Sequence, residues 1–130
     1  LIHLCEHLYK EAATYPWVEM HRDMTLYKFC DIYTLLYNRD LQHTDALVKR
    51  IKELGTQEAC YYAIFCVAEL FDFHPPAVID ILQKIGVENS DFLHEVVTPH
   101  DRGKATYSEK NIKKRFWIAD RQALLKEVKK

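Results

Sequence analysis

Glycine and proline are scarce in this sequence, with 3 and 4 residues among 130. This composition excludes collagen-like and low-complexity chains, and it disfavours a β-sandwich, which needs many turns. No apolar run approaches the ~18–20 residues that a membrane-spanning helix requires. The cysteines form no Cys-x-x-Cys pair, which excludes zinc-ribbon and thioredoxin motifs. The length is typical of one compact domain.

Charge is unevenly distributed along the chain, although the total is only −1. Residues 1–100 hold 8 Lys and Arg against 15 Asp and Glu, a net charge of −7. Residues 101–130 hold 10 against 4, a net charge of +6. A basic end can bind phosphate or an acidic partner, or it can pack on the acidic body of its own chain. Both alternatives stay open at this point.

Apolar residues recur at spacings of three and four, which is the period of amphipathic helices. The pattern predicts helices over residues 1–13, 22–37, 44–54, 57–71 and 77–85, and a short one near 92–97. The helix at 57–71 is apolar on nearly all sides, so we expect it to be central. Gly55 and Gly86 are predicted to end the helices that precede them.

The last third of the chain shows a different pattern. Residues 98–110 have no period and are predicted to form a loop, whereas residues 111–128 return to a helical pattern. Short connections between the helices favour antiparallel neighbours. We therefore predict an all-α, single-domain antiparallel bundle of about six helices. Its main bundle is residues 1–97, and its terminal helix is basic.

The four cysteines lie within apolar helical stretches; they are Cys5, Cys30, Cys60 and Cys66. Free cysteine in such stretches behaves as a small buried hydrophobe. The sequence shows no leader with a basic start, an apolar middle and a small-residue cleavage site. We therefore expect reduced, buried thiols and a cytoplasmic location.

His3, Glu6 and His7 match the pattern His-x-x-Glu-His. On a helix, the two imidazoles lie on one face and could bind one zinc ion, with Glu6 as general base on a bound water. That arrangement would indicate a zinc-dependent hydrolase. However, only three residues are fixed, and no third ligand is distinguished. Two metal-free histidines on a half-buried helix are the favoured interpretation, and the hydrolase is an alternative.

The candidate nucleotide- or partner-binding residues of the basic end are Lys113, Lys114, Arg115 and Trp117. The cations could face phosphates, and Trp117 could stack on a base. Phe116 indicates that one face of this segment must still pack in the core. A partly buried Trp117 that anchors the last helix is therefore the favoured interpretation, and nucleotide stacking is the alternative.

Other catalytic patterns are weak. Arg39 and His43 are superficially similar to the Arg/His motif of ribonuclease-type helical bundles of the HEPN kind, but their spacing is one residue short. Neither Ser90 nor Ser108 lies in a Gly-x-Ser-x-Gly turn. No glycine-rich loop suited to phosphate occurs.

Three segments resemble the C-terminal helical part of a family of uncharacterised bacterial nucleotidyltransferases. The first is the opening helix, LIHLCEHLYKEA. The second is the helix at residues 22–36, in which Asp31 matches the family's Asp. The third is a short amphipathic helix and then an aromatic-rich one, at 45–54 and 58–71, followed by 76–85. The resemblance implies a helical domain with a nucleotidyltransferase-related role.

In such families, a preceding core carries a Gly-Ser turn and an Asp-x-Asp pair that holds two divalent metals for nucleotidyl transfer. This sequence contains neither element, so the resemblance carries over no catalytic residue. It implies no cofactor in this part and Mg²⁺ in the full-length protein. The missing initial Met fits a C-terminal fragment cut just downstream of that core. The expected partners are this N-terminal catalytic domain and a nucleotide, and no membrane is expected.

A helical protein–protein interaction module is the alternative function, and it could form a homodimer. An exposed apolar face along residues 1–12 would favour it. In either case we expect the chain alone to turn over no nucleotide.

Overall fold

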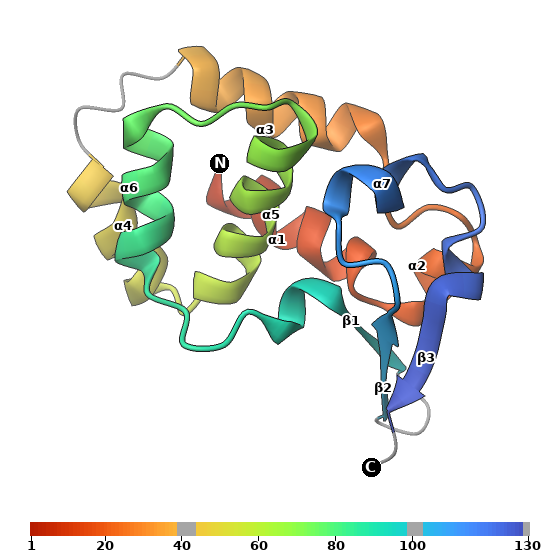
Figure 1. Ribbon diagram of the computed structural model, residues 1–130. Helices are drawn as coiled ribbons and strands as arrows, with labels where there is room; N and C mark the ends of the chain where they lie inside the picture. Colours follow the sequence, from red (N-terminus) through yellow and green to blue (C-terminus); the bar gives the residue numbers. More distant parts are fainter. Residues whose placement is uncertain (39–43, 99–102, 129–130) are drawn as a thin grey trace.

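The computed structural model describes residues 1–38, 44–98 and 103–128 (Figure 1). A helical body, formed by the first six helices, packs beside a smaller C-terminal part that contains three strands (Figure 1). Among the described residues, each helix is too short or too polar to cross a membrane.

The five long helices predicted from the sequence are confirmed. They are α1 (Ile2–Ala12), α3 (Leu26–Asn38), α4 (Thr44–Glu53), α5 (Gln57–Leu70) and α6 (Pro76–Ile85). Gly86 ends α6 with a left-handed φ of 70°, a conformation that costs glycine little because it has no Cβ atom. Gly55, at φ 66°, follows α4 in the same conformation.

Helix α5 is central, as its apolar sequence predicts. It contacts α1, α3, α4, α6 and α7 (Ile112–Trp117). Its buried residues are Cys60, Tyr62, Ala63, Ile64, Cys66, Val67 and Ala68. Burial of this apolar surface is the main force that assembles the body.

The apolar face of α1 packs into the core. Cys5, Leu8 and Ala12 are buried, and Leu1 and Leu4 are partly buried against the same cluster. The exposed apolar face that would favour an interaction module is therefore not found on this helix. All four cysteines are free thiols, and Cys30 is the one of them that is only partly buried.

A short helix, α2 (Tyr15–Glu19), lies where the sequence predicts only a break. Pro16 occupies the first turn of α2. Proline suits that position because its φ is already close to the helical value. It has no backbone N–H group, and the first N–H groups of a helix have no partner within the helix.

The prediction of an all-α fold is wrong for the C-terminal part. An antiparallel sheet in the order β1-β2-β3 is formed by β1 (Glu95–Thr98), β2 (Gly103–Tyr107) and β3 (Leu125–Val128). The segment near 92–97 is a 3₁₀ turn, η2 (Asp91–His94), followed by β1. The segment at 98–110, predicted as a loop, contains β2.

The basic helix predicted over 111–128 ends at Trp117. Asn111 caps its start by accepting a hydrogen bond from the Lys114 amide at 3.0 Å. Beyond α7, the chain forms the 3₁₀ turn η3 (Arg121–Leu124) and then β3. Strand pairing between distant segments outweighs the helical pattern here. The apolar period alone could not predict this, because it does not show which distant segments pair.

The sheet is joined to the body through α2. Val18, Val96 and Tyr107 form a second small core, against which Tyr15 and Leu124 pack. The Val97 amide also donates to the Ala13 carbonyl at 2.7 Å. This junction brings the α2–α3 connection beside β2 and η3.

Candidate functional site

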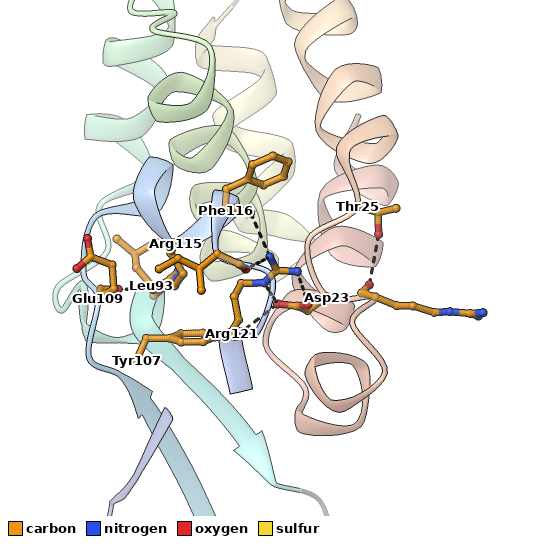
Figure 2. A network of polar contacts seen from close by, with 10 residues as sticks. Asp23, Thr25, Leu93, Tyr107, Glu109, Arg115, Phe116 and Arg121 are labelled. Carbon is orange, nitrogen blue, oxygen red and sulfur yellow. Dashed lines mark hydrogen bonds and ion pairs between the residues drawn. The ribbon is translucent and has the colours of Figure 1, made fainter. Parts of the chain in front are cut away.

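A buried ion pair joins the α2–α3 connection to η3 (Figure 2). Arg121 donates through Nε and Nη2 to the two carboxylate oxygens of Asp23, both at 2.8 Å. The side chains of Arg121 and Asp23 are only 9% and 1% exposed. Such two-point contacts are the strongest geometry for this pair. The pair therefore holds the C-terminal part against the helical body.

The remaining Arg121 nitrogen donates hydrogen bonds to backbone carbonyls at the end of α7. Nη1 donates to the carbonyls of Phe116 and Ile118, at 3.1 and 3.0 Å. Carbonyls at a helix end have no partner within the helix. The guanidinium thus supplies hydrogen bonds that the next turn of α7 would otherwise have made, which helps to explain why the helix stops at Trp117.

A second arginine is buried nearby without a carboxylate partner among its hydrogen bonds in the described structure (Figure 2). Arg115 is fully buried and donates to the Leu93 carbonyl at 2.9 Å, to His94 Nδ1 at 3.1 Å and to the Glu109 carbonyl at 3.4 Å. Its Cζ atom lies 4.3 Å from the centroid of the Tyr107 ring, a cation–π contact. Among the residues that the structure describes, its Nε atom has no hydrogen-bond partner.

Apart from Asp23, three titratable groups near these arginines stay neutral at pH 7, namely Tyr62, Tyr107 and Cys66. Burial raises the pKa of the Tyr62 and Tyr107 hydroxyls, and it raises that of the Cys66 thiol to about 12. A thiol reacts as its thiolate, so Cys66 is not suited to act as a nucleophile. The described contacts of this network join the C-terminal part to the helical body.

His94 makes the stability of the network depend on pH. Burial, the Arg115 guanidinium and Lys110 lower the pKa of His94 from 6.5 to about 4. The unfolded chain therefore takes up more protons than the folded chain as pH falls from about 6.5 to about 4. We expect the free energy of unfolding to fall by about 1–2 kcal/mol across this window. This is less than the full pKa shift implies, because the ring is partly exposed and solvent screens its charge.

Replacing His94 with Gln tests this expectation, since the Gln amide oxygen can still accept from Arg115 but does not titrate. Urea unfolding of both proteins between pH 7 and pH 4.5 measures the difference. The free energy of unfolding of the wild-type chain should fall more steeply than that of His94→Gln. Parallel pH profiles would show that His94 does not carry the effect.

The four basic-end candidates do not share one surface. Lys113 is exposed and donates to Asp72 at 3.0 Å. Lys114 is exposed, and Trp117 is 75% exposed. Arg115 is buried in the network described above, so its guanidinium does not reach a ligand at the surface. The part of the set that faces solvent is Lys113, Lys114 and Trp117.

The structure brings His3 and His7 together on the exposed side of α1. Their ring centroids are 4.5 Å apart, with an angle of 74° between the rings. Glu6 is also exposed, and it lines a groove formed with the start of α5. In the described ranges, no three His, Cys, Asp or Glu side chains are grouped to hold a metal. The third ligand that a zinc hydrolase needs is thus not seen there.

The groove beside Glu6 has a volume of about 750 Å³ and adjoins a hollow of about 390 Å³. Tyr9, Glu58 and Asn89 line both. The acidic residues around them are Glu6, Glu58, Glu88, Asp91 and Glu95. Lys104 is the cation among the lining residues. This concentration of negative charge disfavours phosphate in the groove.

Sequence reasoning missed Asp23 and Arg121 as partners. Asp23 lies in the acidic part and Arg121 in the basic part, so the charge asymmetry is the one signal that could have suggested their contact. Asp31, which carries the resemblance, is exposed on α3. Arg39 and His43 lie outside the described residues.

Comparison with curated proteins finds a similar stretch in a much longer protein of another kind. The chain is 30% identical over 94 residues to a probable phospholipid-transporting ATPase, tat-5, of Caenorhabditis elegans. The aligned region is 71% of this chain and 9% of that protein, so the chain spans less than a tenth of its length. No solved structure matches the chain.

A family model described as uncharacterised nucleotidyltransferase matches residues 1–72. This range includes α1 to α5, which form most of the helical body. It also includes the first two segments that carry the resemblance and the helices at 45–54 and 58–71 of the third, whereas 76–85 lies outside it. The chain therefore belongs to the uncharacterised nucleotidyltransferase family.

Proposed function

We propose that this chain is an accessory helical domain of a nucleotidyltransferase, which helps to cover the nucleotide or the acceptor and does not catalyse transfer alone. The observation that carries the proposal is the family match to α1–α5, in a sequence without the Asp-x-Asp pair that the reaction needs. The catalytic core would lie outside residues 1–130 and would be the principal partner of this domain. Four free thiols favour a reducing compartment, and we propose the cytoplasm.

The residues present do not fit the Mg²⁺ that nucleotidyl transfer uses. Magnesium prefers an octahedral set of carboxylate, phosphate and water oxygens. In the part of the chain that the structure describes, no three potential protein ligands are grouped for this purpose. We therefore assign Mg²⁺ binding to the catalytic core.

Helix α7 offers the surface best suited to a nucleotide. Phe116 contacts Trp117 edge-on, with centroids 5.2 Å apart, and packs in turn on the buried Phe29. This support fixes an exposed aromatic ring for stacking on a base. Lys114, on the same helix, can attract phosphate, and Lys113 can contribute if it leaves Asp72. Stacking together with a nearby cation is a general way to bind nucleotides with little sequence preference.

Binding of ATP labelled at its α-phosphate, with Mg²⁺ present, tests the proposal. We expect reversible binding that Trp117→Ala weakens about tenfold, because stacking contributes about 1–3 kcal/mol per base. Lys114→Ala should also weaken binding, because it removes the cation that attracts phosphate. Equilibrium dialysis measures the affinity. Tyr37→Ala and Lys10→Ala are matched controls, because both residues are exposed but lie on α3 and α1. Equal affinity of all four variants and the wild-type chain would contradict the proposed surface.

A further inference from the structure

His3 and His7 have the separation of two ligands that bind one ion. Both side chains are exposed, and their ring centroids are 4.5 Å apart. Imidazole nitrogens at about 2.0–2.1 Å from a shared ion place the centroids roughly 4.5–5.2 Å apart, for angles at the metal of about 90–110°. The two rings are therefore close enough for one ion to contact both, once a nitrogen of each ring is turned toward it.

Helix α1 fixes this pair in place. Residues four apart lie on the same face of a helix, one turn above the other. The opposite face of α1 is anchored, because Cys5 and Leu8 are buried in the main core. The two imidazoles thus project from a rigid element, which reduces the conformational entropy that ion binding must overcome.

We propose that His3 and His7 form a two-histidine binding site for a divalent transition-metal ion of the zinc, nickel and copper class. Neutral imidazole suits these ions, whereas Mg²⁺ prefers oxygen ligands. The site is therefore separate from the Mg²⁺ of nucleotidyl transfer and does not depend on the proposed function. Because no third protein ligand is grouped with the pair among the described residues, the other coordination positions are open to water or to an exogenous ligand.

Titration with Ni²⁺ alone tests the site. The α-amino group of Leu1 is first acetylated, because a free amine two residues before His3 could itself bind Ni²⁺ with that imidazole. A phosphine reductant keeps the thiols free. We expect one Ni²⁺ per wild-type chain by isothermal titration calorimetry, and a higher Tm when Ni²⁺ is present, because the ion binds the folded helix.

The variants His3→Ala and His7→Ala should each weaken binding by at least about tenfold. Loss of a residue that only hydrogen-bonds a metal ligand already lowers affinity by about 10- to 100-fold, and these two residues are the ligands themselves. Both positions are exposed, and circular dichroism should show that helix content is unchanged. His74→Ala is the matched control, since His74 is exposed on the connection between α5 and α6. Retained affinity in His7→Ala, an equal loss in His74→Ala, or no binding by the wild-type chain would overturn the proposal.

Discussion

Replacing Asp23 with alanine is expected to lower the free energy of unfolding by about 3–5 kcal/mol, because the buried Arg121 guanidinium would lose its counter-ion. The carboxylate accepts two hydrogen bonds of 2.8 Å from Arg121. Domains of this size are stable by about 5–15 kcal/mol, so the loss would be a large part of the total. The C-terminal part, which the pair holds against the helical body, should loosen first.

Urea unfolding of Asp23→Ala measures this loss, and two further variants serve as comparisons. Asp31→Ala removes an exposed carboxylate from α3 and should change stability by less than about 0.5 kcal/mol. The double variant Asp23→Leu with Arg121→Met removes both charges and should be more stable than Asp23→Ala. A loss below about 1 kcal/mol in Asp23→Ala would contradict the assigned role of the pair.

Replacing Arg115 with alanine is expected to cost about 3–5 kcal/mol, since it opens a cavity in the core and leaves buried acceptors unpaired. The acceptors are the Leu93 carbonyl and His94 Nδ1, and the Tyr107 ring loses its stacked cation. Arg115→Lys should recover little of this stability, because an ammonium group lacks the planar fork that reaches both acceptors.

The neighbouring Lys114 provides the control for Arg115. Lys114 is exposed on the same short helix, and its contact with the Asn111 cap uses the backbone amide, which alanine retains. Lys114→Ala should therefore leave the midpoint of urea unfolding nearly unchanged. If Arg115→Ala and Lys114→Ala unfolded at the same urea concentration, Arg115 would not be the internal anchor that its burial indicates.

The helical body was predictable because the signals that specify its helices lie within each helix and next to its ends. Apolar period, Gly55 and Gly86 place α4, α5 and α6 within a residue or two of their positions. The sheet was not predictable in this way, because β2 joins two segments that local pattern cannot pair. The helical period of residues 111–128 is real, but strand pairing and the Arg121 contacts end the helix at Trp117.

The candidate site was predicted only in part, for the same reason. Lys114 and Trp117 face solvent, whereas Arg115 has the sequence context of a surface residue and lies in the core. Charge type does not distinguish a solvated arginine from one that a Tyr107 ring and backbone carbonyls surround. The burial of Asp23 likewise depends on a partner 98 residues away.

The central claim is that residues 1–130 contribute to nucleotide handling without catalysing transfer. Incubation of the chain with Mg²⁺ and α-phosphate-labelled triphosphates, followed by separation of acid-stable products, tests it most directly. We predict label that is bound and released on dilution, with no covalent product above the level of a denatured control. Robust covalent transfer by the wild-type chain would show that it holds an active site, and the assignment as an accessory domain would then be wrong.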